Sequence, residues 1–297
     1  MGLIQCIKSW IYSFITRNQL LFYILPILFP VMRLFSDPDK KSNDKITDKD
    51  GHSFPVVNVN GRYFPAFGVD KIRSIPDLTI RKSDVILCGY PKTGCHWVHE
   101  ILNMLVNGKA ELTKYGKGIG GFIDFMPDIL ADSLPSPRVL NTHVLYEELP
   151  RGILEMKNKI ILTVRNPKDS VVSYFNHMKT MKDLYQYEGD FNGLFDVFMS
   201  QTMEYGNYFD YYLSWDELLK NPDKHDILLV KFEDNKADPV GCVKRMAEFL
   251  EIKITDEFAA QVVENTSIKK MKAKREGQHA SGLLRKGTCN NNLETYF

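Results

Sequence analysis

The chain has 297 residues, which is enough for one large domain or two modest ones and for a substantial buried core. Its formal net charge is only +1, so no global field favours a nucleic-acid partner, and none is expected. The five cysteines are scattered without a C-x-x-C pair, which argues against a disulfide framework and a zinc site and makes the reducing cytoplasm the simplest compartment.

The N-terminal segment, residues 1–35, is apolar and contains the uninterrupted run LLFYILPILFPVM at 20–32. A membrane-spanning helix needs about 20 apolar residues, and Pro26 and Pro30 would kink a helix here. A membrane anchor, a segment on the membrane surface and a helix packed against the protein all stay open. We therefore expect a cytoplasmic protein for which membrane contact through residues 9–35 is an open alternative.

A charged and polar stretch without aromatic residues follows at 36–53 and is interpreted as a solvated linker. The rest of the chain, 54–297, is interpreted as one domain. Four apolar runs in it are typical of buried parallel strands, at 84–90, 138–143, 159–165 and 226–232. Helical patterns alternate with these runs, at 95–107, 167–180, 193–220, 238–250 and 256–264. The alternation predicts an α/β fold with a mostly parallel sheet flanked by helices on both faces.

Ligands of such a sheet lie at the carboxyl ends of its strands, and three of the expected strands end in chemically useful residues. The first runs into YPKTGCHW at 90–97, and two others end at His143 and Arg165. In the turn, N–H groups at a helix N-terminus and the charge of Lys92 favour an anion, and Gly94 permits close approach. A simple turn with an exposed lysine is the alternative. Because Lys92 precedes the glycine, the turn does not match the GxxxxGK[ST] loop of P-loop kinases.

YPKTGCHW resembles the YPKSGTTW loop of the cytosolic-type sulfotransferases, which use 3′-phosphoadenosine 5′-phosphosulfate (PAPS). The resemblance implies the sulfotransferase fold, with its P-loop-like sheet, and a loop that binds the phosphosulfate through Lys92, Thr93, Gly94, Cys95 and His96. Lys92 would neutralise charge on the bridging oxygen as the S–O bond breaks, and Trp97 would stack on the adenine. Cys95 and His96 replace the family's Thr-Thr, which removes two hydroxyl donors, and a protonated His96 could donate instead.

The run VLNTHVLYEELP at 139–150 carries His143. A histidine at a strand end is more often structural, but this one lies beside two expected anion-binding strand ends, which favours a function. The run resembles the family's KTH motif, which implies that His143 is the catalytic base for the acceptor hydroxyl, a task that suits the pKa of imidazole. Asn141 replaces the family's lysine by an uncharged donor, so slower chemistry is expected. By the same resemblance, Asn141, Thr142 and His143 line the substrate.

The run RNPKDSVVSYF at 165–175 follows the third expected strand. Arg165 offers a planar fork of donors that suits phosphate oxygens. Asn166 is a good helix cap, and Pro167 fits the first helical turn. The run resembles the family's RNPKDVxVSYY segment, which implies that Arg165 and Ser173 bind the 3′-phosphate. Without the resemblance, Ser173 would be interpreted as a solvent-facing helix serine.

The remaining matches lie in the last third of the chain. LLVKFED at 228–234 resembles a strand end at which Phe232 replaces an adenine-contacting tyrosine. NTSIKKMK resembles the family's TSFxxMK segment, which implies nucleotide contacts from Thr266, Ser267 and Ile268. RKG resembles a loop around the 3′-phosphate, which implies contacts from Arg285, Lys286 and Gly287. Core packing explains most of the aromatic run at 205–215, but the resemblance places part of it, including Tyr205, at the acceptor pocket.

Residues after Gly287 do not match the family's GDWK sequence or the C-terminal helix that carries its dimerisation motif, so the oligomeric state is left open. The predicted activity is transfer of the sulfuryl group of PAPS to a hydroxyl, or less often an amine, of a small and lipophilic acceptor molecule. No carboxylate pair is placed for a metal, and no metal is expected.

Two alternatives stay open. A non-catalytic relative that binds PAP (3′-phosphoadenosine 5′-phosphate) or PAPS would explain the departures at Cys95, His96, Asn141, Phe232 and Ile268. The enzyme is favoured by the groups that carry the chemistry, which are Lys92, His143, Arg165, Ser173 and Arg285. A membrane-anchored Golgi-type sulfotransferase is suggested by the N-terminal segment. The glycosylation sequon at Asn265 lies in the expected nucleotide site, where a glycan would block binding, so none is expected there.

Overall fold

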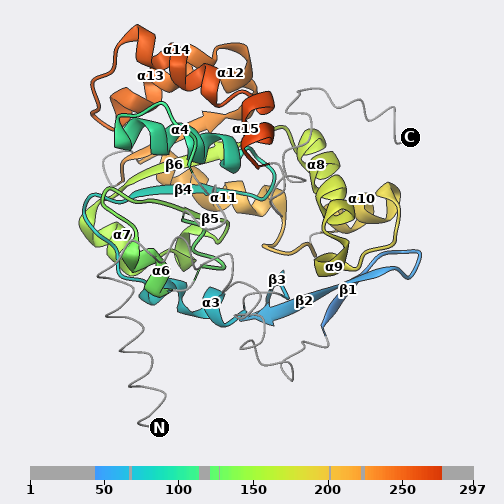
Figure 1. The fold of residues 1–297 in the computed structure, drawn as a ribbon. Helices are drawn as coiled ribbons and strands as arrows, with labels where there is room; N and C mark the ends of the chain where they lie inside the picture. The colour runs from blue at the N-terminus through green and yellow to red at the C-terminus, as the bar shows by residue number, and fades with distance from the viewer. Residues whose placement is uncertain are drawn as a thin grey trace, which may run out of the picture.

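The computed structural model describes residues 44–66, 69–113, 121–126, 128–200, 202–221 and 225–275. The apolar segment 1–35, the first part of the expected linker and the predicted phosphate-binding residues 285–287 lie outside the described residues. A central sheet lies among two groups of helices, and a small second sheet lies along the lower side of the molecule in Figure 1.

Four parallel strands form the central sheet, in the order β5-β4-β6-β7. They are β4 (Val85–Gly89), β5 (Val139–Thr142), β6 (Lys159–Val164) and β7 (Ile227–Lys231), and they confirm the four predicted runs. The aliphatic side chains of β4 point to both faces and are buried on both. Ile86 packs into the core on one face and Leu87 into the core on the other, because successive side chains of a strand alternate.

Helices cover both faces of this sheet, which confirms the predicted fold class (Figure 1). The core on one face takes side chains from α4 (Cys95–Asn107), α13 (Pro239–Phe249) and α14 (Asp256–Asn265). The core on the other face takes them from α7 (Arg151–Met156), α8 (Pro167–Thr180), α10 (Phe191–Met199) and α11 (Tyr208–Leu219). The described shorter helices are α3 (Val69–Ser74), α6 (Asp128–Ser133), α9 (Lys182–Tyr185), α12 (Phe232–Ala237), α15 (Ile268–Arg275) and two 3-10 turns, η1 (Ile75–Asp77) and η2 (Tyr146–Glu148).

Two of these helices begin directly after central strands. α4 follows β4 and is bounded by Gly94 and Gly108, whose φ angles of 105° and 63° suit glycine. α8 follows β6, with Pro167 in its first turn, and the side chain of Asn166 caps it by accepting a hydrogen bond from the Lys168 N–H. The N-terminal turns of both helices therefore lie at the carboxyl edge of the sheet.

The single helical stretch expected at 193–220 is wrong. The structure divides it into α10 and α11, and the chain turns between them at Tyr205 and Gly206, which have φ angles of 63° and 81°. Asn207 then caps α11 by accepting from the Phe209 N–H at 2.6 Å. Gly206 and Asn207 are helix stop and start residues, so the signal for this break was present in the sequence.

The expected linker at 36–53 also differs from the structure where it is described. Residues 44–53 lead into an antiparallel sheet of β1 (Lys45–Thr47), β2 (Ser53–Val59) and β3 (Arg62–Pro65). Asp48, between the first two strands, is buried and accepts hydrogen bonds from the Tyr187 hydroxyl at 2.7 Å and the His52 N–H at 2.8 Å. The buried contact with Tyr187 joins this stretch to the rest of the domain, and a composition-based interpretation of the stretch could not include it.

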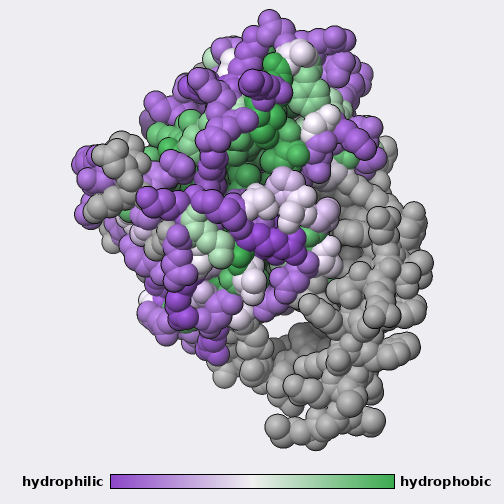
Figure 2. Space-filling view, turned by 90° about the vertical axis from the view of Figure 1, so that its left-hand side faces the viewer, coloured by the Kyte–Doolittle hydropathy of each residue, from purple (hydrophilic) through white to green (hydrophobic). Residues whose placement is uncertain are grey.

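Among the described residues, no helix is both long enough and apolar enough to cross a membrane. Figure 2 shows one face of the molecule, on which hydrophilic side chains cover most of the surface and hydrophobic ones gather mainly in the upper half. In the described part of the chain, the large hydrophobic side chains that are clearly exposed are Met199, Phe209 and Leu213. Phe209 and Leu213 lie four positions apart on α11 and therefore on one face of that helix.

Candidate active site

The loop at 90–97 makes a sharp turn between β4 and α4. Lys92 has a φ of 74°, which is uncommon for a residue other than glycine, and Gly94 has a φ of 105°. A Cβ atom at Gly94 would lie 2.8 Å from Cδ2 of Phe232, so glycine is required for space as well as for conformation. The N–H groups of the first helical turn have no partner within the helix. The loop therefore brings these donors and Lys92 together at the carboxyl end of β4, which suits an anion.

Side chains beneath the loop hold it to the sheet. Thr93 is buried, and its hydroxyl donates to the Tyr90 carbonyl at 2.7 Å and lies 2.9 Å from the Thr163 hydroxyl. The Cys95 thiol is buried 3.2 Å from the same Thr163 oxygen. Thr93 and Cys95, two predicted cofactor-binding residues, thus turn their side chains into the protein and present only backbone groups to a ligand.

Arg165 adds a second positive charge next to the loop. Its side chain is only 7% exposed, and Nη1 donates to the Lys92 carbonyl at 3.3 Å. The guanidinium carbon lies 4.2 Å from the centre of the Phe232 ring, so the planar group is held over an aromatic face. Ser173, the other predicted phosphate ligand, is half-buried on α8, two turns after Arg165. The predicted anion-binding loop and Arg165 are therefore brought together.

Trp97 and Phe232 form an aromatic wall beside the same loop. Their ring centres are 5.7 Å apart with the planes at 72°, and the Lys236 ammonium lies 5.4 Å from the Trp97 ring. Within the described chain, the indole N–H of Trp97 is buried and has no hydrogen-bond partner. A buried donor without an acceptor is costly, so this wall is suited to a ligand that brings an acceptor.

His143 lies at the end of β5 and is 6% exposed. Its Nδ1 is 2.6 Å from the Gly89 carbonyl oxygen, the last residue of β4. A carbonyl oxygen can only accept, so Nδ1 carries the proton of this bond, and in the neutral imidazole Nε2 is the basic nitrogen. The edges of two rings, Phe122 and Tyr205, pack against the imidazole at centroid distances of 5.0 and 5.5 Å.

Tyr205 is held in its positive-φ conformation from both sides. Its N–H donates to the Tyr63 carbonyl at 2.8 Å, and its own carbonyl accepts from Nη2 of Arg62 at 2.9 Å. Arg62 also binds the Glu148 carboxylate at 2.5 Å. Burial raises the pKa of the Tyr205 phenol well above its ordinary value, and the Asp124 carboxylate adds to the rise. The small antiparallel sheet thus fixes a predicted substrate-binding residue against His143.

A segment that sequence reasoning missed, residues 121–126, completes this side of the site. It runs alongside β5, because the Ile123 N–H donates to the Asn141 carbonyl at 2.9 Å and the Asn141 N–H donates to the Gly121 carbonyl at 2.7 Å. A Cβ at Gly121 would lie 2.1 Å from the Val139 carbonyl oxygen, so only glycine allows this approach. The segment places Phe122 and Asp124 next to His143. An isolated Asp in the apolar run GFIDFM is the signal that could have drawn attention to it.

The structure does not bring Asn141 and Thr142 to a ligand-facing position. Both are 0% exposed. The Asn141 amide nitrogen donates to the Leu87 carbonyl at 2.7 Å, and the Thr142 hydroxyl donates to Asp124 at 2.5 Å. Asn141 was expected to donate to a sulfuryl oxygen of the ligand. Its amide instead donates within the sheet, because an asparagine side chain is short, whereas a lysine would extend out of the sheet.

The segment of Thr266, Ser267 and Ile268 connects α14 to α15. Thr266 is buried, and its hydroxyl donates to the Val262 carbonyl at 2.8 Å. The neighbouring Asn265 donates to the Ala110 carbonyl at 2.6 Å, just beyond the C-terminal end of α4. α4 has 13 residues and is therefore about 20 Å long. The contact of Asn265 thus lies at the opposite end of α4 from the loop, and the nucleotide contacts of the segment stay a prediction.

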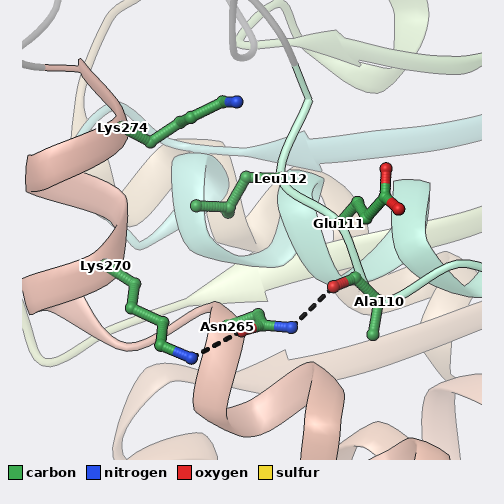
Figure 3. A pocket seen from close by; sticks show the side chains of 6 residues that line it. All are labelled: Ala110, Glu111, Leu112, Asn265, Lys270 and Lys274. Carbon is green, nitrogen blue, oxygen red and sulfur yellow. Dashed lines mark hydrogen bonds between the residues drawn. The ribbon is translucent and has the colours of Figure 1, made fainter.

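A pocket of about 360 Å³ lies beside that segment and is drawn in Figure 3. Its lining residues are Ala110, Glu111, Leu112, Asn265, Lys270 and Lys274. Lys270 binds the Glu264 carboxylate at 2.6 Å and the Asn265 amide oxygen at 2.8 Å, so its charge is already compensated. This pocket is separate from the strand-end site. Among the described residues, no group of three or more His, Cys, Asp or Glu could hold a metal ion.

Comparisons with known proteins agree with the geometry at the strand ends. A family model described as the sulfotransferase domain matches residues 82–292. The chain is 29% identical over 253 residues to Sulfotransferase 6B1 of Danio rerio, covering 83% of this chain and 81% of the relative. It is 32% identical over 228 residues to Sulfotransferase 1A1 of Rattus norvegicus, covering 73% and 77%. A crystal structure of mouse sulfotransferase SULT7A1 complexed with PAP superimposes with a TM-score of 0.69 at 25% identity, covering 82% of this chain and 89% of that one.

Proposed function

The chain belongs to the sulfotransferase family and is a PAPS-dependent sulfotransferase, and from this premise we propose that it transfers the sulfuryl group of PAPS to a hydroxyl of a small, lipophilic acceptor, with His143 as the base. An amine is the less common acceptor. The observation that carries the proposal is the hydrogen bond between His143 Nδ1 and the Gly89 carbonyl at 2.6 Å. This bond makes Nε2 the basic nitrogen of the neutral imidazole, and it holds the ring against the strand that leads into the phosphate loop.

The residues around the loop fit the nucleotide. Lys92 and the first N–H groups of α4 suit the 5′-phosphosulfate, and Arg165 with Ser173 suits the 3′-phosphate. The adenine fits against Trp97 and Phe232, where the buried indole N–H still needs an acceptor. Bound PAPS supplies an activated sulfuryl group on a phosphate leaving group. Contacts from His96, Thr266, Ser267, Ile268, Arg285, Lys286 and Gly287 remain predictions.

Two side chains carry the chemistry. Nε2 of His143 accepts the proton of the acceptor hydroxyl as the hydroxyl oxygen attacks sulfur, and base catalysis of this kind typically contributes about 10²- to 10⁴-fold. The Lys92 ammonium offsets the negative charge that develops on the leaving phosphate oxygen. The charges present at the loop and the base are thus fixed before the reaction, so little reorganisation is needed.

An apolar acceptor is supported by the rings around the base. Phe122 and Tyr205 present their edges to His143, and Phe64 packs against Tyr205 at a ring distance of 5.6 Å. Aromatic rings give large apolar contact areas, and ligand sites are lined mainly by such side chains. The acceptor therefore needs an apolar body next to the reacting hydroxyl.

The test is sulfuryl transfer from PAPS to a panel of phenols, steroids, aliphatic alcohols and amines, together with calorimetric binding of PAP. We expect the wild type to sulfate at least one lipophilic hydroxyl compound. His143→Gln should lower kcat at least about 100-fold and leave PAP affinity within a few-fold of wild type. PAP binding without transfer to any acceptor would favour the non-catalytic relative. Unchanged kcat in the variant would remove His143 from the reaction.

A further inference from the structure

Asp124 is a fully buried carboxylate directly behind the proposed base. It is 0% exposed on the 121–126 segment, and each of its oxygens accepts a hydrogen bond. One bond comes from the Thr142 hydroxyl at 2.5 Å and the other from the His143 backbone N–H at 3.0 Å. The carboxylate therefore fixes the backbone of the residue that carries the imidazole.

Other groups that interact with Asp124 come from α3, β4, α11 and the turn before α11. Lys71 of α3 is the cation, and although burial lowers the pKa of its ammonium, Asp124 counters part of that change. The remaining neighbours are uncharged at neutral pH: burial raises the pKa values of Tyr205, Cys88 and Tyr211 well above normal, and Asp124 contributes to each rise. A negative charge on Asp124 thus acts on titratable groups from several elements.

A second buried carboxylate has a purely structural explanation. Asp84 is buried at the opposite end of β4 and accepts from Nε of Arg138 at 2.9 Å, a side chain that is itself buried. The described hydrogen bonds to Asp124 come instead from Thr142 and from the backbone N–H of His143, the residue whose imidazole gains charge in the proposed reaction. A buried charge is costly unless it is paired and hydrogen-bonded, and these bonds connect the Asp124 carboxylate to His143.

We propose that Asp124 is a positioning residue for His143, which holds its backbone in place and stabilises the imidazolium that forms when Nε2 takes the acceptor proton. The inference rests on the proposed function, because it needs His143 to act as the base. Asp124 accepts from the backbone N–H of His143, so it acts on the imidazole through position and through its electric field. A full charge within a few ångströms in a buried site is expected to shift a pKa by about one to two units.

The test is Asp124→Asn, which keeps the size and an acceptor oxygen but removes the charge. The imidazole of His143 is titrated by NMR in the PAP-saturated protein, and its signal among the seven histidines is assigned by its loss in His143→Gln. We expect the pKa of His143 to fall by about one unit or more. We also expect kcat to fall roughly 10- to 100-fold and the acid limb of the kcat/KM profile to move to lower pH, because that limb reports the free base.

Matched variants separate this role from a general effect of burial. Asp48 is also buried and also accepts from a hydroxyl and from backbone N–H groups, but it lies on the small sheet, so Asp48→Asn should leave the His143 titration unchanged. Asp124→Glu keeps the charge, so the pKa of His143 should stay close to the wild-type value. Thr142→Val removes a donor and keeps the charge, so the pKa of His143 should stay at or above the wild-type value.

The outcomes distinguish the two proposals. An unchanged His143 pKa in Asp124→Asn, or a fall of the same size in Thr142→Val, would overturn the role of Asp124 whatever the activity of the wild type. A lowered pKa in a protein that sulfates no acceptor would support the coupling and remove the proposed function. If Asp124→Asn does not fold, the Thr142→Val and Asp124→Glu titrations decide, since a structural role predicts a pKa drop in both.

Discussion

The two ends of β4 differ in what their buried polar groups do. At the N-terminal end, Asp84 and Arg138 neutralise each other, and Arg138 also donates to the Ala131 carbonyl at 3.0 Å and the Thr79 carbonyl at 2.9 Å. At the C-terminal end, Lys92 has a positive φ, the Trp97 N–H is buried without a partner in the described chain, and Nδ1 of His143 binds the Gly89 carbonyl. The buried polar groups at the N-terminal end hold the fold together, and those at the C-terminal end suit a ligand.

The largest expected effect is at the N-terminal end of β4. Arg138→Met leaves Asp84 buried without its counter-charge, which should lower the free energy of unfolding by about 3–5 kcal/mol. Urea denaturation measures this. Arg151→Met is the matched control, because it removes a guanidinium from an exposed ion pair with Asp77 and should cost less than about 1 kcal/mol. Equal losses in the two variants would contradict the comparison.

At the C-terminal end of β4, Lys92→Met should act on chemistry rather than on stability. Removing the charge that faces the leaving phosphate should lower kcat about 10²- to 10³-fold, with a small change in the free energy of unfolding. Steady-state rates and urea denaturation on the same preparation check both. Lys168→Met, at an exposed position in the first turn of α8, serves as the control. A loss of stability that matched the loss of rate would argue that the loop lysine is structural.

A buried titratable group, Glu204, is connected to the C-terminal end of β4 through Tyr174, whose ring packs against Tyr90. Burial raises the pKa of Glu204 to about 7, while the Tyr174 and Tyr185 hydroxyls donate to it at 2.5 and 2.8 Å. The folded state then binds this proton more tightly than the unfolded chain, so the free energy of unfolding should fall as pH rises from about 4.5 to 7. The change amounts to roughly 3 kcal/mol or less.

Glu204→Gln should remove that pH dependence. Urea denaturation at several pH values from 4.5 to 8 compares the variant with wild type, and Glu257→Gln on the exposed side of α14 controls for the loss of a carboxyl group. If the difference between wild type and Glu204→Gln is constant over this range, Glu204 does not titrate in the folded protein.

The smallest expected effects come from Gly94 and Gly108, the two glycines that bound α4. They distinguish the cost of a left-handed backbone from the cost of a steric contact. Gly108→Ala meets no atom within 4 Å, so it should cost only the left-handed conformation, about 1–2 kcal/mol. Gly94→Ala adds a contact of 2.8 Å with Phe232, which must move. PAP affinity, measured by calorimetry, should therefore fall about 10-fold in Gly94→Ala, equivalent to ~1.4 kcal/mol, and stay constant in Gly108→Ala. Equal PAP affinities would mean that the ring is not part of the nucleotide site.

The sequence predicted those features that depend on nearby residues. The four central strands, the starts of α4 and α8, and the glycine-and-lysine loop follow from apolar runs, caps and turn residues that lie within a few positions of one another. Arg62 could not be found in this way, since its contact with the Tyr205 carbonyl spans 143 positions. Asp124 lies 19 positions from His143, and only the pairing of its segment with β5 brings them together.

Other differences between the expectations from the sequence and the structure arose because a residue was interpreted by its type alone. Asn141 was expected to donate to the ligand, but its side chain is too short to leave the sheet and bonds to Leu87 instead. The charged residues around Asp48 were expected to form a linker. A hairpin and a linker can have the same charged composition, and only the pairing of β1 with β2 and the contact of Asp48 with Tyr187 distinguish them. In both cases the position of a polar side chain depends on its hydrogen-bond partner, and the partner cannot be identified from the sequence.

The bond from His143 to Gly89 has a consequence for how specificity can change. His143, the proposed base, binds the last residue of β4, and Lys92 follows that residue by only three positions, so in the proposed mechanism one strand end sets the distance between proton removal and leaving-group stabilisation. The rings that border His143 come from other parts of the chain, Phe122 from the 121–126 segment and Tyr205 from the turn before α11. Exchange of these rings can therefore retune the enzyme to a new acceptor while the spacing of its reactive groups is inherited intact.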